Sequence, residues 1–302
     1  MGINAHLTLL TDSRYLTPQP GNDYVSNIFL EDKLLTEALE RLGYHVQRTN
    51  WDNPNYDWSA THAAVFRTTW DYFHRADSFR RWLKDVCAHT RLINDYEVVM
   101  WNMDKTYLLV LQQRGLAIPP TLLVHAGSSQ TLKGILSICC WEEVILKPAI
   151  SGAARHTYRF TAREATAYEP VFQQLIGQEA VLLQQFQPSV LKRGEAALMF
   201  FDGRYSHAVL KRARPGDFRV QDDFGGTVHP YQPAADEIEL ARKALQCSPQ
   251  PPVYGRVDLL WNEAGKPLVS ELELIEPELW LRCSEPAAAL FADALHKALQ
   301  CS

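Results

Sequence analysis

Hydrophobic residues follow two alternating patterns over the first hundred positions of the chain. Short apolar-rich runs typical of β-strands occupy residues 6–10, 44–51, 63–70 and 91–95. Between them, residues 27–42 and 75–89 carry apolar side chains at helical spacing, and Gly43 is well suited to end the first helix. Strands that alternate with helices predict an α/β lobe built around a mostly parallel sheet.

Beyond residue 100 the pattern changes to hairpins and covering helices. A helix is predicted to begin at Asn102, whose side chain can cap it, and to end at Gly115. Apolar runs predict strands at residues 143–147, 156–160 and 180–186, and on both sides of the turn-forming pair Asp202-Gly203. Residues 234–246 and 285–300 are amphipathic and predict helices that cover a sheet.

The most informative stretch is residues 253–280, which reads VYGRVDLLWNEAGKPLVSELELIEPELW. Two runs of alternating polar and apolar residues flank a turn-like segment, as in a β-hairpin. Pairing across that turn places Asp258 opposite Glu271, and it places Arg256 opposite Glu273. Side chains two residues apart share a face of a strand, so all four are predicted to lie on one face while the intervening apolar residues pack inward.

Three carboxylates and a single cation on one face call for compensation. Two carboxylates about 5 Å apart repel by roughly 3 kcal/mol at an effective dielectric of about 20. Mg2+ would turn that repulsion into attraction, because it is a hard ion held by carboxylates and substrate phosphates. Asp258, Glu271 and Glu273 are therefore candidate metal ligands. The alternative is a solvated strand face whose charges point into water.

Two lysines are candidates for binding an anion. Lys105 falls in the predicted first turn of a helix, where a cation opposes the helix dipole, so an anionic partner would explain it. Lys147 ends an apolar strand, and the small residues of the following loop, including Ser151 and Gly152, would let backbone N–H groups approach a polyphosphate. The alternatives are a solvated Lys105 and a Lys147 that extends past the sheet edge into water.

Polar residues at other strand ends add candidates. The apolar run 180–186 becomes polar at Gln184 and Gln185, which could form a hinge that hydrogen-bonds a nucleobase, although alone they indicate only a strand end. Glu195 and Lys211 fall at the same end of one predicted hairpin. Arg219 lies in the loop that follows.

Residues beyond the third predicted strand are candidates for a substrate pocket. Ligands of parallel sheets bind beyond the carboxyl ends of the strands. Arg67, Trp70 and Asp71 lie there and could offer an anion-binding fork, an aromatic wall and a polar anchor. The alternative is that the aromatic residues belong to the core and that Arg67 is paired locally.

Composition narrows the functional classes. The 302-residue chain has a formal net charge of −5 and no basic tract, which argues against nucleic-acid binding. Its six cysteines show no CxxC spacing, and no signal peptide or membrane-spanning run is recognisable, so we expect a cytoplasmic protein that does not bind membranes. A homodimer is compatible with the sequence, which does not decide the oligomeric state.

The order of these features resembles the ATP-grasp superfamily, specifically its glutathione-synthetase-like branch. The shared features are Lys105, Lys147-Pro148 with a small-residue loop, an apolar run ending in a polar hinge, Glu195, and the RVD and ELE strands of the hairpin. The segments WNMDK, GDFRVQDDFGGTV and ELELIEP are most similar to ligases of the D-cycloserine type. The resemblance covers essentially the whole chain.

The resemblance implies an α/β plus α+β architecture. An N-terminal α/β lobe over residues 1–100 would precede a two-subdomain ATP-grasp fold. Residues 101–185 would form its lid subdomain, and residues 186–302 its C-terminal subdomain.

The resemblance also implies how ATP is held. Lys105 and Lys147 would contact the phosphates, helped by the loop that contains Ser151 and Gly152. The segment from Gln184 through Gln185 to Phe186 would line the adenine, and Glu195 would lie on the ribose side. The loop is poorer in glycine than is usual in the superfamily.

The remaining residues are implied to serve the reaction. Asp258, Glu271 and Glu273 would hold Mg2+, although the superfamily commonly has Asn at the last of these positions. Arg256 would steady the transferring phosphoryl group. Lys211 and Arg219 would reach the phosphates or the acyl phosphate, and the candidates beyond the third strand, with Arg219, would shape the acceptor pocket.

The function implied is an ATP- and Mg-dependent carboxylate–amine ligase. It would activate the carboxylate of a small amino-acid-like substrate as an acyl phosphate for attack by an amine, with intramolecular cyclisation as one form. A kinase that phosphorylates a small molecule and a non-enzymatic ATP-binding module remain open. The carboxylate triad speaks against the module, because binding alone needs fewer carboxylates. Neither GxSxG nor a Walker loop occurs in the sequence.

Overall fold

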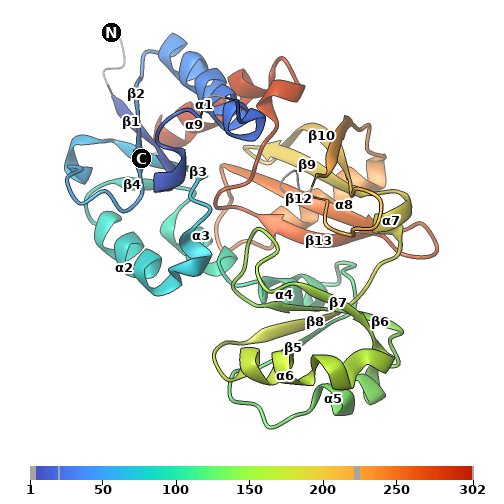
Figure 1. Cartoon of the computed structure of the whole chain (residues 1–302). Coiled ribbons are helices and arrows are strands. Elements are labelled where there is room, and N and C mark those ends of the chain that lie inside the picture. The colour runs from blue at the N-terminus through green and yellow to red at the C-terminus, as the bar shows by residue number, and fades with distance from the viewer. Residues whose placement is uncertain (1–4, 20, 221–224, 301–302) are drawn as a thin grey trace.

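Three β-sheets organise the chain in a computed structural model that describes residues 5–19, 21–220 and 225–300 (Figure 1). The strands are β1 (His6–Thr11), β2 (His45–Asn50), β3 (Ala63–Thr68), β4 (Arg91–Ile93), β5 (Thr121–Val124), β6 (Glu143–Pro148), β7 (Tyr158–Thr161), β8 (Val181–Gln185), β9 (Glu195–Phe201), β10 (Arg204–Arg212), β11 (Thr227–Pro230), β12 (Tyr254–Trp261) and β13 (Pro267–Glu273). The α-helices are α1 (Asp23–Arg41), α2 (Ala76–Val86), α3 (Tyr96–Asn102), α4 (Tyr107–Gln113), α5 (Leu132–Cys139), α6 (Ala165–Ile176), α7 (Ser189–Lys192), α8 (Ala235–Leu245) and α9 (Ala287–Gln300).

The first sheet has the order β2-β1-β3-β4, and its strand pairs are parallel, as the alternating pattern predicts. Helix α1 begins earlier than the apolar spacing indicated, because the Asn22 side chain caps it by accepting a hydrogen bond from the backbone N–H of Val25. Strand β3 is buried along its whole length, so its side chains show no alternation between the core and solvent.

The second sheet has the order β5-β8-β6-β7 and is antiparallel. Apolar side chains from its strands and from helices α5 and α6 form one buried cluster, so these helices cover a face of the sheet (Figure 1). Strands β6 and β8 are the two central strands. The carboxyl end of β6, at Pro148, lies beside Val181 at the start of β8, and the loop that follows Lys147 leaves the sheet there.

The third sheet has the order β11-β10-β9-β12-β13 and is also antiparallel. Helix α8 packs on one face of it. A second cluster joins strands β9 and β10 to helix α9 and to strand β1 and helix α1 of the first sheet. The first and third sheets therefore share a continuous core.

The β12–β13 hairpin confirms the predicted pairing. Asp258 lies opposite Glu271, and Arg256 lies opposite Glu273. The register shifts immediately beyond, where Leu259 pairs with Val269, so Ser270 is an extra residue in β13. Such a bulge was not predicted, and it has a physical consequence. It lets Val269 point into the core while Glu271 stays on the carboxylate face.

One predicted helix is wrong in its boundaries. The segment expected to start at Asn102 consists of two helices, α3 and α4, and Asn102 ends the first of them instead of capping the second. Lys105 consequently lies in the turn between the helices and precedes α4. The buried Asn102 amide donates a hydrogen bond to the Leu272 carbonyl at 2.8 Å and accepts one from the Leu274 N–H at 2.7 Å. It thereby fastens β13 to the helical segment.

Among the described residues, no helix combines the length and the apolar character that crossing a bilayer requires.

We expect Asn102→Ala to lower the free energy of unfolding by about 2–4 kcal/mol, because two buried backbone groups lose their partner. Urea denaturation measures the change. The exposed Asn55, whose side chain makes none of these contacts, supplies the control Asn55→Ala, for which we expect no more than about 0.5 kcal/mol. A loss below about 1 kcal/mol for Asn102→Ala would contradict the fastening role.

Candidate active site

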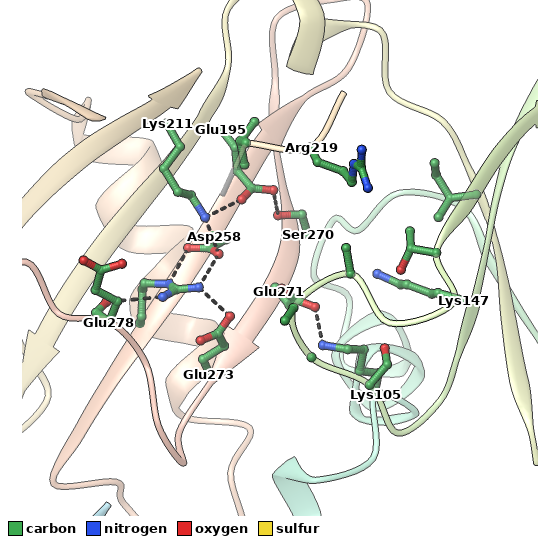
Figure 2. Close-up of a pocket in the computed structure, with 18 of the residues that line it drawn as sticks. Lys105, Lys147, Glu195, Lys211, Arg219, Asp258, Ser270, Glu271, Glu273 and Glu278 are labelled. Carbon is green, nitrogen blue, oxygen red and sulfur yellow. Dashed lines mark hydrogen bonds and ion pairs between the residues drawn. The ribbon is translucent and has the colours of Figure 1, made fainter. Parts of the chain in front are cut away.

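One cavity of about 310 Å3 is lined by side chains from all three sheets and their loops (Figure 2). Most of the predicted site residues meet in it, although they are spread over two hundred positions of sequence. Those that line the cavity are Trp70, Lys105, Lys147, Ser151, Gly152, Gln184, Gln185, Phe186, Glu195, Lys211, Arg219, Arg256, Asp258, Glu271 and Glu273.

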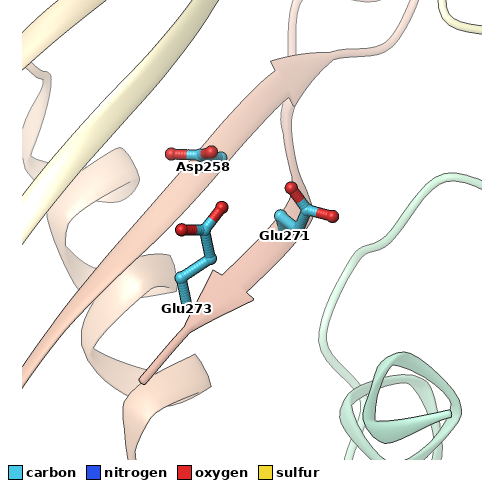
Figure 3. Close-up of side chains that lie close together, drawn as sticks. All are labelled: Asp258, Glu271 and Glu273. Carbon is cyan, nitrogen blue, oxygen red and sulfur yellow. The ribbon is translucent and has the colours of Figure 1, made fainter. Parts of the chain in front are cut away.

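The carboxylates of the hairpin converge at the centre of this cavity. Asp258, Glu271 and Glu273 each offer an oxygen, and these oxygens lie within 4.8 Å of one another (Figure 3). The donor set contains oxygen ligands and neither histidine nor cysteine, which is the set preferred by a hard cation such as Mg2+. The residues present therefore fit the metal that the sequence predicted.

Lysine and arginine side chains compensate the carboxylates. Arg256 donates from Nε and Nη2 to the two oxygens of Asp258 at 2.9 and 3.0 Å, and it also pairs with Glu273. Lys211 lies 2.8 Å from Asp258 and 2.5 Å from Glu195, whose other oxygen accepts a hydrogen bond from Ser270. These contacts explain how like charges can share one strand face.

Glu271 is compensated from the other side of the cavity. Lys105 forms an ion pair with it across the space between α4 and β13 (Figure 2). Burial opposes ionisation of this carboxyl group, but attraction to Lys105 and Lys147 outweighs burial and holds the pKa of Glu271 below its usual range. Glu271 is thus a permanent anion that a metal can bind without first displacing a proton.

Two neighbouring carboxyl groups behave differently. Burial raises the pKa of Glu273 to about 7, although attraction to Arg256 opposes the shift. Burial together with repulsion from Glu273 raises the pKa of Glu276 to about 8. Burial thus favours the protonated form of these two carboxyl groups, in contrast to Glu271.

Lys147 has a different environment from Lys105. Within the described part of the chain, its ammonium group makes no ion pair, and burial lowers its pKa. A partly buried cation without a counter-ion is suited to receive a phosphate.

The loop that follows Lys147 is shaped by its backbone and by the first lobe. Ala153, Ala154 and His156 have φ values of 46°, 55° and 49°, in the left-handed region that favours glycine. A Cβ atom on Gly152 would lie 2.4 Å from the Phe73 ring, so a side chain there would force the two apart. The loop is therefore seated directly on the first lobe.

Two residues of the predicted hinge, Gln184 and Gln185, form hydrogen bonds within the second sheet and the segment that leads into it. The buried Gln184 side chain donates to the Thr121 hydroxyl at 2.9 Å, and the Gln185 N–H donates to the Pro120 carbonyl. The Arg159 guanidinium lies 3.9 Å from the centre of the Phe186 ring. Phe186 thus lines the cavity with an aromatic ring, while the backbone N–H groups of Gln185 and Phe186 are bonded to carbonyl groups at neighbouring strands.

Two predicted substrate residues do not line the cavity. Arg67 is 2% exposed, and its Nε donates to Asp32 at 3.2 Å. Asp71 accepts a hydrogen bond from the Trp51 indole at 2.7 Å and pairs with Arg75. The expectation that these two face a ligand is wrong because their charges are used inside the first lobe. Trp70, from the same segment, does reach the cavity.

The sequence reasoning also missed residues of the cavity wall. Tyr15 and Tyr24 were not predicted and join the predicted Trp70 in an aromatic wall, and Glu276 and Glu278 lie beyond the end of β13. The two glutamates continue the acidic run of the hairpin, a signal that could have revealed them. The tyrosines belong to a turn-rich loop and a helix start, and nothing in the local pattern marks them.

The cavity thus brings Lys105, from the turn before α4, and Lys147, from β6, together with a carboxylate triad on β12 and β13, as the resemblance to ATP-grasp enzymes implies. Residues 7–94 match the protein-family model of the D-cycloserine synthetase DcsG N-terminal domain. The cycloserine biosynthesis protein DcsG of Streptomyces lavendulae is 34% identical over 285 residues, which cover 88% of this chain and 93% of that protein.

Comparison with solved structures supports the same family and fold. The crystal structure of D-cycloserine synthetase DcsG superposes with a TM-score of 0.87 at 32% identity and covers 98% of this chain and 100% of its own. The D-alanine–D-alanine ligase of Bacillus anthracis, at 12% identity and a TM-score of 0.67, covers 98% of this chain and 97% of its own and shares the fold. The chain belongs to the DcsG family of ATP-grasp ligases, and it is an ATP-dependent carboxylate–amine ligase.

The raised pKa of Glu276 predicts an unusual pH dependence of stability. The folded state holds this proton up to a pH of about 8, whereas the unfolded chain releases it near its ordinary value. The stabilisation is therefore complete below the unfolded value and is lost as the pH rises through about 8.

The unfolding free energy of the wild type should decrease between pH 5 and pH 9 as Glu276 loses its proton. We expect this decrease to be smaller in Glu276→Gln, by more than about 1 kcal/mol, because glutamine does not titrate. Urea denaturation at several pH values provides the test. The exposed Glu285 supplies the control Glu285→Gln, which should retain the wild-type slope. Equal slopes for Glu276→Gln and wild type would refute the shift.

Proposed function

We propose that this ligase transfers the γ-phosphoryl group of ATP to the carboxylate of a small amino-acid-like substrate and that a nitrogen nucleophile then attacks the acyl phosphate. The single observation that carries the proposal is the meeting of Lys105, Lys147 and the carboxylate triad in one cavity. Similarity to proteins named for D-cycloserine synthesis supports ring closure, in which carboxylate and nitrogen belong to the same molecule.

Asp258, Glu271 and Glu273 are the residues that would hold Mg2+. When bound, the metal neutralises charge on the phosphates and helps to orient them. Their present partners are cationic side chains, so a bound metal would replace part of the compensation that Lys105 and Arg256 now supply. Those cations would then be available to the phosphate oxygens.

The side chains around the triad suit phosphoryl transfer. A carboxylate oxygen of the substrate forms a bond to the γ-phosphorus, and the bond to the ADP oxygen breaks. This step needs positioned positive charge rather than covalent help from the protein. Lys147 makes no salt bridge with a described residue, and Arg256 is oriented by two hydrogen bonds to Asp258.

The second step forms the carbon–nitrogen bond. The nitrogen attacks the acyl carbon, inorganic phosphate leaves with the bonding electron pair, and the nitrogen loses one proton. Lys211 and Arg219 line the same cavity and would stabilise the departing phosphate. Gln184, Gln185 and Phe186 would receive the adenine, and Glu195 would lie near the ribose.

We expect Glu271→Gln to fold normally and to lose at least about 100-fold in ATP turnover, because the metal loses a permanently charged ligand. The assay supplies ATP, Mg2+ and a panel of amino acids with hydroxylamine, which converts an acyl phosphate into a hydroxamate. ADP and hydroxamate are measured together, and circular dichroism reports folding.

Glu263→Gln, in the exposed turn of the same hairpin, is the control and should behave as wild type. Unchanged turnover of Glu271→Gln would refute the metal assignment. Formation of ADP with a stable phosphorylated alcohol and no hydroxamate would replace the ligase by a kinase.

A further inference from the structure

An aromatic wall forms the end of the cavity that faces the first lobe. Tyr15 ends the short 3-10 turn η1 (Ser13–Tyr15), Tyr24 lies in the first turn of α1, and Trp70 follows β3. The centres of the tyrosine rings lie 5.7 and 6.0 Å from the indole and 6.4 Å from each other. All three rings are partly buried and line the cavity.

Glu276 is fixed beside this wall. The Trp70 indole N–H donates to the Glu276 carbonyl at 2.8 Å, which ties the backbone of the segment after β13 to the indole. The Glu276 side chain lines the cavity. It accepts a hydrogen bond from its own backbone N–H, and no lysine or arginine among the described residues forms a salt bridge with it.

The other charged groups at this end are already neutralised. Arg14 pairs with Asp12 at 2.7 Å and also donates to the Trp70 carbonyl. Burial lowers the pKa of His74, which disfavours the charged form of this imidazole. Neither group supplies a counter-charge for Glu276.

The carboxylates and cations toward the triad are paired as well. Glu278 lies 2.9 Å from the Arg282 guanidinium (Figure 2 shows Glu278). Lys105 and Arg256 attract Glu276, but Lys105 pairs with Glu271 and Arg256 with the other triad carboxylates. Glu276 is thus a cavity carboxyl group for which no described lysine or arginine supplies a salt bridge, and a cationic ligand would favour its ionised form.

We infer that Glu276, together with the wall of Tyr15, Tyr24 and Trp70, binds a protonated amine of the substrate. A carboxylate in a cavity gains a charge-assisted hydrogen bond from an ammonium group, and aromatic faces attract the same cation. Lys147, on the phosphate side, likewise makes no salt bridge with a described residue, so the cavity holds one ammonium group and one carboxyl group that a ligand can pair. A zwitterionic amino acid matches this arrangement, with its carboxylate toward the triad and its amine toward Trp70.

This inference deepens the proposed function, because it names the group that selects the substrate. It is tested by binding, which does not require turnover. Calorimetry would titrate the common amino acids in both configurations into the enzyme saturated with Mg2+ and a non-hydrolysable ATP analogue. For each amino acid that binds, the matched acid without the amine is titrated in parallel, for example propionate against alanine.

We expect at least one amino acid to bind about tenfold or more tightly than its matched acid. Glu276→Gln should weaken that amino acid by about tenfold or more and leave the matched acid within about twofold. Glu276→Asp, which keeps the charge, should retain part of the preference, and the exposed Glu285→Gln should retain all of it. The Trp70→Leu variant should also lower the preference.

The inference is overturned if no amino acid binds more tightly than its matched acid, or if Glu276→Gln weakens both equally. The hydroxylamine assay separates it from the proposed function. Amine-selective, Glu276-dependent binding without any hydroxamate would refute acyl phosphate formation and leave the inference standing. If wild type and Glu276→Gln both formed hydroxamate as efficiently from the matched acids as from the amino acids, acyl phosphate formation would stand and the inference would be refuted.

Discussion

Charge compensation on the inner face of the β12–β13 hairpin is the constraint on which the rest of the structure depends. Three carboxylates share that face, and their mutual repulsion must be met by cations. Arg256 meets it within the hairpin, Lys211 from β10 and Lys105 from the turn before α4. The helical segment and the strands of the third sheet are thus held around one acidic centre.

The same centre explains why the cavity suits a nucleotide and an acid together. Asp258 is paired with both Arg256 and Lys211, whereas Lys147 and Glu276 make no salt bridge with a described residue. Substrates that carry phosphate, carboxylate and amine groups would supply the missing partners. The protein therefore specifies its ligands largely through the ionisable groups that its described side chains leave unpaired.

Much of this site was predictable from sequence because its centre is local. Alternation and a turn were enough to pair Asp258 with Glu271, since both lie on adjacent strands of one hairpin. The bulge at Ser270 was not predictable, because it depends on the packing of Val269. Arg67 was misassigned because β3 is buried on both faces and offers no alternation from which to read direction. Tyr15 and Tyr24 reach the cavity only through tertiary packing, which no local pattern reports.

The contact between Gly152 and Phe73 has a kinetic consequence. Because the phosphate-side loop rests on the first lobe, any outward movement of the loop would separate Gly152 from the Phe73 ring. The rate of nucleotide exchange would then depend on how readily that seam opens, and a side chain larger than hydrogen at position 152 would hold it ajar.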